Sequence, residues 1–292
     1  MSEQKVVRNA MTVDVEDYFQ VSAFAPYIAR GDWEGCECRV ERNIERILAL
    51  FAQHQTKATF FTLGWIAERY PQVVRDIVAQ GHELASHGYG HERASDLSPQ
   101  AFMQDIVRAK SLLEDLGGRE VIGYRAPSFS IGKGNLWAFD SLREAGYLYS
   151  SSVYPIQHDH YGMPDSPRFA YPVREGLLEV PVSTLRVMNR NIPSSGGGYF
   201  RLLPYPVSRW LIRQVNAQEQ QAAVFYFHPW EIDVDQPRLV GIDSKSRFRH
   251  YVNIARTHDR IGRLLQDFAW GRMDEIFLGR RTAALAASTV AA

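Results

Sequence analysis

Short apolar segments alternate with longer amphipathic segments along most of this chain. The short segments are rich in β-branched and aromatic residues, as buried strands are, and they cover residues 10–14, 58–63, 83–86, 121–124, 147–149, 178–180 and 222–227. The longer segments have helical periodicity and cover residues 42–53, 71–80, 98–117, 134–145, 206–217 and 249–268. Strands that are regularly followed by helices predict a parallel sheet, with functional side chains at the carboxyl ends of the strands. For a chain of 292 residues we expect a closed or partly closed β/α barrel rather than an open sheet.

Two parts of the chain fall outside this alternation. Residues 157–194 contain five prolines and, apart from the predicted strand at 178–180, are expected to be irregular and to line a binding cleft. Residues 281–292 are rich in alanine and are expected to form a frayed tail. Residues 1–280 are therefore predicted to form a single domain.

Charge and composition narrow the classes of partner. Lys plus Arg and Asp plus Glu are balanced at 33 each, so no net charge attracts nucleic acid or an acidic membrane surface. No segment reaches the roughly 18 apolar residues that a transmembrane helix needs, and the N-terminus lacks the apolar core of a signal peptide. We therefore expect a soluble, cytoplasmic protein. Cys36 and Cys38 are expected to be reduced thiols, because a loop of one residue is too tight for an unstrained disulfide.

Two histidines follow the predicted strand at 83–86. His87 and His91 can lie on one side of a helix or of a tight strand-to-helix turn, and two imidazoles in that arrangement can bind one metal ion. The same spacing also occurs with ordinary surface or hydrogen-bonded histidines. A metal site therefore requires a third ligand and a base from elsewhere in the chain.

Three carboxylates stand at the end of the first predicted strand. In an extended chain Asp14 and Glu16 point to one side and Asp17 to the other. Such residues can also form a solvated turn that caps a helix. Carboxylates held close together repel each other unless a cation or a shared proton relieves the repulsion. Because two histidines and one carboxylate form the protein ligands of a catalytic zinc-type site, this cluster suits His87 and His91.

Two further strand ends carry groups suited to acid–base chemistry. Arg125 follows the strand at 121–124 and can keep a carboxylate ionised through a bidentate pair; an ordinary surface arginine is the alternative. His228 ends the strand at 222–227, where it can exchange a proton near neutral pH; a hydrogen-bonded core histidine is the alternative.

These groups occur in an order that resembles the NodB-homology polysaccharide deacetylases, carbohydrate esterase family four. The residues that resemble the first, second, third and last motifs of that family are 12–14, 86–91, 124–127 and 227–229. The resemblance spans about residues 8–280 and includes the connecting segments 58–64, 81–87 and 146–152. Within the family, residues 14–19 and 194–201 most resemble the subgroup that accompanies exosortase and exopolysaccharide gene clusters.

The resemblance implies a deformed (β/α)7 barrel of the TIM type and the hydrolysis of N-acetyl groups from a hexosamine polymer in exopolysaccharide biosynthesis. It also implies a divalent metal, with zinc as the first choice at a site of nitrogen and oxygen ligands. The implied roles are metal ligation by Glu16, His87 and His91, base catalysis by Asp14 with Arg125, and protonation of the leaving amine by His228.

Three residues are expected to contact the substrate, an N-acetylated polysaccharide or a lipid-linked oligosaccharide at the inner face of the membrane. The backbone N–H of Ser128 would stabilise the developing oxyanion. The rings of Tyr199 and Trp230 would lie against sugar rings, with packing at the rim of the barrel as the alternative.

The chain departs from the family pattern at two positions. Most members have two adjacent aspartates, whereas Val15 follows Asp14 here, so Glu16 is the matching ligand and Asp17 the second choice. Ser150 stands where aspartate is frequent, which leaves open the partner that tunes the catalytic arginine or histidine. Two rival functions follow: a metal-free hydrolase of cyclic amides such as allantoin, and a non-catalytic glycan-binding protein on the same scaffold.

Overall fold

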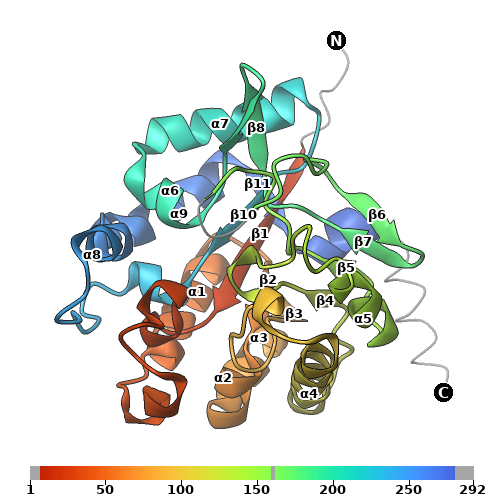
Figure 1. The fold of residues 1–292 in the computed structure, drawn as a ribbon. Coiled ribbons are helices and arrows are strands. Elements are labelled where there is room, and N and C mark those ends of the chain that lie inside the picture. Colours follow the sequence, from red (N-terminus) through yellow and green to blue (C-terminus); the bar gives the residue numbers. More distant parts are fainter. Residues whose placement is uncertain (1–6, 159–161, 280–292) are drawn as a thin grey trace.

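A curled sheet of parallel strands forms the centre of the protein. The structure is a computed structural model and describes residues 7–158 and 162–279. Among these residues, seven strands follow one another in the order β10 (Val224–Phe227), β1 (Arg8–Val15), β2 (Thr59–Thr62), β3 (Glu83–Ser86), β4 (Gly123–Tyr124), β5 (Tyr149–Ser150) and β7 (Leu177–Glu179). Each neighbouring pair is parallel. Figure 1 shows β1 in red, and β1 lies between β10 and β2 in this sheet.

The barrel is open. Antiparallel β6 (Tyr171–Arg174) pairs with β7 at one edge, and β11 (Ala269–Gly271) joins β1 beside the main path. In the part of the chain that the structure describes, β10 and β6 lie at opposite ends of the path and do not pair with each other. The predicted α/β class with a deformed barrel is confirmed.

Amphipathic helices cover the outer side of the sheet (Figure 1). They are α1 (Val40–Gln53), α2 (Gly64–Arg69), α3 (Pro71–Ala79), α4 (Pro99–Gly117), α5 (Ala138–Glu144), α7 (Tyr205–Gln218) and α9 (Ile254–Asp267). In α1 the predicted stripe is buried, with Ile47 and Phe51 wholly inaccessible to solvent. Because these helices cover one face of the sheet and side chains fill the other, β1, β2, β3 and β10 are buried along almost their whole length.

Local sequence signals account for most element boundaries. Ser98 caps α4, since its hydroxyl accepts a hydrogen bond from the N–H of Ala101 at 3.2 Å. The prediction of one helix over 249–268 is wrong: α8 (Ser244–Tyr251) and α9 are separate helices. Asn253 has the left-handed φ of 54° that interrupts the helical path between them.

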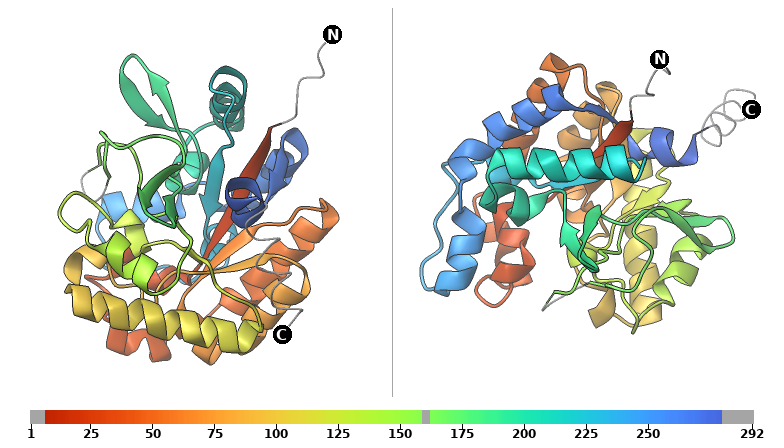
Figure 2. Two further views of the ribbon diagram at one scale, coloured as in Figure 1. Left: turned by 90° about the vertical axis from the view of Figure 1, so that its right-hand side faces the viewer. Right: turned by 90° about the horizontal axis from the view of Figure 1, so that it is seen from above.

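The prediction that residues 157–194 are largely irregular is also wrong. They contain β6, β7 and a hairpin of β8 (Thr184–Val187) and β9 (Arg190–Pro193), which projects from the body of the protein (Figures 1 and 2). The hairpin turn consists of Met188 and Asn189, both with positive φ, as a two-residue turn between twisted strands requires. Short helix α6 (Gly197–Leu202) follows the hairpin.

The structure bears on two other expectations from the sequence. Within residues 7–158 and 162–279, no helix combines the length and apolar character that crossing a membrane requires. The predicted tail at 281–292 lies outside the described residues.

Candidate metal and acid–base centre

Charged side chains converge at the carboxyl edge of the sheet. Asp14 lies near the end of β1, His87 directly follows β3, Arg125 follows β4 and His228 follows β10. Because these strands are parallel and form one continuous path, their carboxyl ends meet at the same edge. Residues separated by more than 200 positions in the sequence thereby enter one site.

Glu16, His87 and His91 form a group that could hold a metal ion. One potential ligand atom from each residue lies within 4.8 Å of the other two. Oε2 of Glu16 is 2.6 Å from Nε2 of His91, and this buried oxygen has no hydrogen bond of proper geometry. A buried carboxylate oxygen without a hydrogen bond, beside two imidazoles, fits the donor set of a divalent cation such as zinc.

His87 is held in the state that a metal ligand requires. Its Nδ1 lies 2.8 Å from the carbonyl oxygen of Arg125, which can only accept a hydrogen bond, so Nδ1 carries the proton and Nε2 has a free lone pair. Burial lowers the pKa of His87 to about 4, although the neighbouring Asp14 carboxylate opposes this effect. The ring is therefore neutral at physiological pH.

The loop between the two histidines has an unusual backbone. Gly88 and His91 both have positive φ, 75° and 56°. Asp105 of α4 holds this loop from behind, accepting hydrogen bonds from the N–H of Tyr89 at 3.0 Å and of Gly90 at 3.4 Å. A left-handed conformation costs a residue with a β-carbon about 1–2 kcal/mol, so these contacts help to keep His91 directed at Glu16.

Glu16 is buried, yet it remains ionised. Burial alone would raise its pKa, but the positive charges of His91 and His228 outweigh that effect and hold the pKa of Glu16 well below its usual value. Nε1 of Trp230 donates a hydrogen bond to Oε1 of Glu16 at 3.3 Å. The sequence suggested that Trp230 contacts sugar rings; the structure buries it, with its ring stacked on His228.

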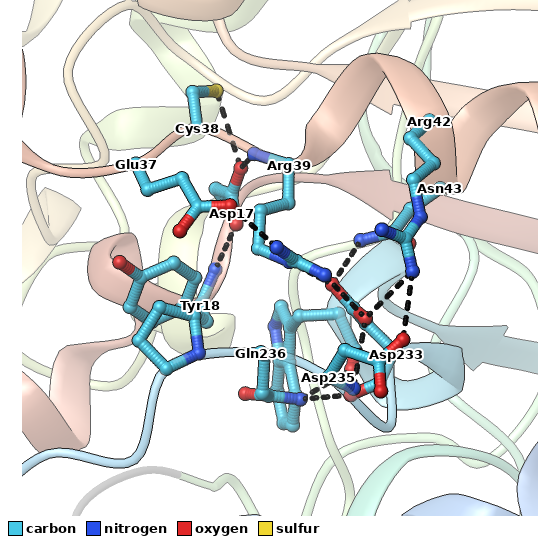
Figure 3. A network of polar contacts seen from close by, with 12 residues as sticks. Asp17, Tyr18, Glu37, Cys38, Arg39, Arg42, Asn43, Asp233, Asp235 and Gln236 are labelled. Carbon is cyan, nitrogen blue, oxygen red and sulfur yellow. Dashed lines mark hydrogen bonds and ion pairs between the residues drawn. The ribbon is translucent and has the colours of Figure 1, made fainter.

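Asp17, the second choice for the carboxylate ligand, is directed at Tyr18, Cys38 and Arg39 (Figure 3). It accepts hydrogen bonds from the backbone N–H of Tyr18 at 2.7 Å and of Arg39 at 2.5 Å, and from Sγ of Cys38 at 3.2 Å. Cys38 is a free thiol, as is Cys36. Strand alternation had placed Glu16 and Asp17 on opposite sides, and the structure has that arrangement.

Asp14 and Arg125 form a buried ion pair. One guanidinium nitrogen of Arg125 lies 2.5 Å from Oδ1 of Asp14 and also donates to Thr12 Oγ1 at 2.8 Å. The other donors of Arg125 reach the carbonyl oxygen of Ser151 at 3.2 Å and its hydroxyl at 3.0 Å. Because this guanidinium occupies Oδ1, Oδ2 is the oxygen of Asp14 that faces His228.

His228 approaches Glu16 and Asp14. Its Nε2 is 3.6 Å from Oε1 of Glu16 and 3.9 Å from Oδ2 of Asp14. Its Nδ1 is 2.7 Å from Oε1 of Glu231. Burial by itself would lower the pKa of His228. The negative charges of Glu16 and Glu231 outweigh that effect and raise the pKa to about 9.

Glu231 and Arg201 are site residues that the sequence reading missed. Oε2 of Glu231 accepts a hydrogen bond from Nε of Arg201 at 2.6 Å, and burial of both side chains is nearly complete. The hydrogen-bond partner of His228, left open in the sequence because Ser150 stands where aspartate is frequent, is thus Glu231. Its position three residues after His228, on the turn formed by Pro229–Ile232, was the available signal.

Ser128 and Tyr199 are the other two residues expected to contact substrate. Ser128 lies in the turn Pro127–Phe129 after β4, and Tyr199 lies on α6. Ser128 has a left-handed φ of 55°, and its hydroxyl is 2.5 Å from that of Ser22. Tyr199 lines a small pocket with Ser195 and Leu203. Neither residue belongs to the group of charged side chains.

Two family models match adjacent parts of the chain. Residues 34–149 match the model described as polysaccharide deacetylase. Residues 151–278 match a domain of unknown function, DUF3473. The first part contains His87, His91 and Arg125, and the second contains Arg201 and His228. Asp14 and Glu16 precede both matched parts.

Named relatives resemble a limited part of the chain. A peptidoglycan deacetylase of Helicobacter pylori is 33% identical over 131 residues, which is 43% of this chain and 40% of that protein. A chitooligosaccharide deacetylase of Sinorhizobium fredii is 47% identical over 63 residues, 22% of this chain and 29% of that protein. The chain thus spans less than half the length of these curated relatives.

Solved structures extend the similarity of fold to nearly the whole chain. A candidate polysaccharide deacetylase from Mycobacterium smegmatis superposes with a TM-score of 0.59 at 21% identity, covering 97% of this chain and 94% of that one. An allantoinase superposes with a TM-score of 0.57 at 16% identity, covering 94% of this chain and 90% of that one. At this level of identity these likenesses show the fold alone, whereas the match of residues 34–149 and the similarity to named deacetylases show a likeness to polysaccharide deacetylases over part of the chain.

Proposed function

We propose that this protein is a metal-dependent hydrolase that removes N-acetyl groups from N-acetylhexosamine units of a polysaccharide. The observation that carries the proposal is the group formed by Glu16, His87 and His91, which lies beside the Asp14–Arg125 pair. A divalent cation, with zinc as the first choice, would bind to this group, where it would polarise the acetamide carbonyl and make a water molecule more acidic.

Asp14 is suited to act as the base. The ion pair with Arg125 fixes Oδ1, while Oδ2 faces His228. Oδ2 would take one proton from the attacking water as the water oxygen bonds to the acetyl carbon. Because Arg125 is wholly buried, the carboxylate has little freedom to turn away.

His228 is suited to act as the acid. Glu231 holds Nδ1, so Nε2 is the nitrogen directed at the site. As the carbon–nitrogen bond breaks, Nε2 would give a proton to the departing nitrogen, and the products are acetate and a free amine. This proton is essential, since an amide anion is a very poor leaving group. Water then returns the proton to His228 and removes the one on Asp14.

Relatives support the class of substrate. Curated relatives are named for peptidoglycan and for chitooligosaccharide, which both carry N-acetylated hexosamines. A role in exopolysaccharide biosynthesis agrees with the match to DUF3473 over residues 151–278. Action on a lipid-linked oligosaccharide, in the cytoplasm or at the inner face of the membrane, stays a prediction.

The rival functions make less use of the site. A metal-free hydrolase of cyclic amides would not need a buried carboxylate oxygen without a hydrogen bond beside two imidazoles, as Glu16 provides. A protein that only binds glycans would not require the buried Asp14–Arg125 pair opposite His228. Burying such pairs is costly, so their presence favours chemistry.

Metal analysis and acetate release together test the proposal. We expect about one divalent ion per chain and release of acetate from an N-acetylhexosamine oligomer. Asp14→Asn should abolish acetate release while the metal stays bound, because Asp14 lies outside the ligand group. His87→Ala should lose the metal and the activity together. A protein that binds no zinc, or an Asp14→Asn variant with unchanged turnover, would contradict the proposed mechanism.

A further inference from the structure

Arg201 lies in the glycine-rich segment 194–201, which the proposed mechanism does not use. We infer that Arg201 is a positioning residue, which acts through Glu231 to fix the ring of His228 in the orientation needed to protonate the leaving amine. The inference rests on the proposed function, because it concerns the acid of that reaction. It assigns a task to a part of the chain that matches only a domain of unknown function.

The contacts between the three residues form a continuous buried chain. Oε1 of Glu231 receives two hydrogen bonds from His228, one from Nδ1 at 2.7 Å and one from the backbone N–H at 3.0 Å. Oε2 receives the bond from Nε of Arg201 at 2.6 Å. The side chains of Glu231 and Arg201 are only 1% and 3% exposed, so water cannot replace either partner. Both oxygens of one carboxylate are thus fixed, one on each neighbour.

Arg201 is itself held by backbone groups from a third segment. One of its guanidinium nitrogens donates to the carbonyl oxygen of His250 at 2.5 Å and to that of Val252 at 3.2 Å. Its guanidinium carbon lies 5.0 Å from the centre of the Trp230 ring, and that ring stacks on His228 at 5.2 Å. A planar guanidinium can bind several acceptors in one plane, whereas a lysine ammonium at the same place could not.

The glycines of the segment bring Arg201 to this position. Gly196 and Gly197 have φ of 80° and 51°, and a β-carbon at Gly196 would collide with the backbone oxygen of Tyr226 in β10. Only glycine allows the chain to approach the strand so closely in this conformation. Helix α6 therefore begins directly against β10, the strand that His228 follows, and Arg201 projects from its last turn.

Loss of Arg201 should act on His228 specifically. Without the guanidinium, Oε2 of Glu231 would be a buried, charged oxygen with no donor, and the carboxylate would turn to find one. Turning moves Oε1, on which the orientation of the His228 ring depends. The contacts among Glu16, His87 and His91 should stay unchanged, because none of the hydrogen bonds of Arg201 and Glu231 described above involves these three residues.

A double-mutant cycle with Arg201→Met and His228→Ala tests the inference. With an N-acetylhexosamine oligomer, we expect Arg201→Met to lower kcat about 10- to 100-fold while KM changes by less than about twofold. In the His228→Ala background the same substitution should cause no further loss, because its effect passes through His228. Equal losses in both backgrounds would show a general structural role and overturn the inference.

A second substrate separates positioning of the acid from general damage. 4-Nitrophenyl acetate releases a stable phenolate that needs no proton, so Arg201→Met and His228→Ala should both slow amide cleavage far more than ester cleavage. Equal slowing of amide and ester by Arg201→Met would overturn the inference. If Arg201→Met does not fold, Glu231→Gln takes its place in the same cycle, because it keeps the size of the side chain and removes the charge.

Arg168→Met is the matched control. Arg168 also binds a carboxylate, Glu219, at 2.7 Å and a backbone oxygen, that of Thr184, but it has no contact with Glu231. It should lower thermal stability without changing the ratio of amide to ester cleavage. A His228→Ala variant with wild-type amide cleavage would instead refute the acid assigned under the proposed function, which distinguishes that failure from a failure of the inference.

Discussion

Asp105 offers a direct test of how the metal group is held in place. Its carboxylate accepts the N–H groups of Tyr89 and Gly90, which lie between the two histidines, and it does not belong to the ligand group. Asp105→Asn keeps the size of the side chain but replaces one accepting oxygen with a donor. One of the two loop N–H groups then faces another donor and loses its hydrogen bond.

The expected magnitude follows from these contacts. A hydrogen bond to a charged group contributes about 1.5–3 kcal/mol, and the bond at 3.0 Å is the stronger of the two. The lost energy had favoured the backbone in which His91 has its positive φ. If the free loop relaxes, the metal must restore that conformation when it binds. A cost of 1.5–3 kcal/mol corresponds to about 10- to 100-fold weaker metal binding.

Competition with a chelator of known affinity would measure the zinc dissociation constant of each variant. Glu114→Gln is the matched control, because Glu114 lies on the same helix and accepts the backbone N–H of Val121 at 2.9 Å, away from the histidine loop. Both variants should lose thermal stability, but only Asp105→Asn should bind zinc more weakly. Equal zinc affinity in Asp105→Asn and the wild type would refute the reasoning.

Three other outcomes are expected. Zinc at 100 times its dissociation constant should raise the free energy of unfolding by about 2.7 kcal/mol in the wild type and not in His87→Ala, as measured by urea titration. Trp230→Phe keeps the stacked ring but removes the hydrogen bond to Glu16, so zinc affinity should fall about three- to tenfold in the same chelator assay; unchanged affinity would contradict this role. Glu179 is buried, and burial raises its pKa to about 7 although Ser150 and two backbone N–H groups oppose the shift. Because the pKa of Glu179 is higher in the folded protein than the unfolded value near 4.5, its protonated carboxyl stabilises the fold at low pH, and this stabilisation is lost as the pH rises through 7. Glutamine at this position cannot titrate. The free energy of unfolding of the wild type should therefore fall relative to that of Glu179→Gln by roughly 2–3 kcal/mol between pH 5 and pH 8. A constant difference across that range would show that Glu179 does not titrate as described.

Local patterns in the sequence accounted for most of the fold. The seven predicted strand segments all contain or overlap a strand of the parallel path, because β-branched and aromatic residues favour buried strands. Failures occurred where a single residue changes the direction of the backbone. Asn253 divides one predicted helix, and the Met188–Asn189 turn makes a hairpin in a segment expected to be irregular.

In the site, the sequence favoured Glu16 over Asp17, because strand alternation is a property of adjacent residues, but it kept Asp17 as the second choice. Asp105 and Arg201 could not be recognised in this way. Their partners are backbone groups or side chains on other elements: Asp105 lies 16 residues from Tyr89, and Arg201 lies 30 residues from Glu231. Such contacts depend on how elements pack, and no periodicity or spacing encodes them.

The sequence by itself determined which elements form and which chemical groups stand at the carboxyl ends of the strands, because apolar periodicity and chain alternation act over a few residues. Only the tertiary structure decided which of these groups meet. Parallel pairing brings Asp14, His87, Arg125 and His228 to one edge of the sheet, and the packing of α6 against β10 places Arg201 behind the acid. The orientation of each ring and carboxylate depends on these distant contacts, since a buried charged group must take the partners that the folded chain provides.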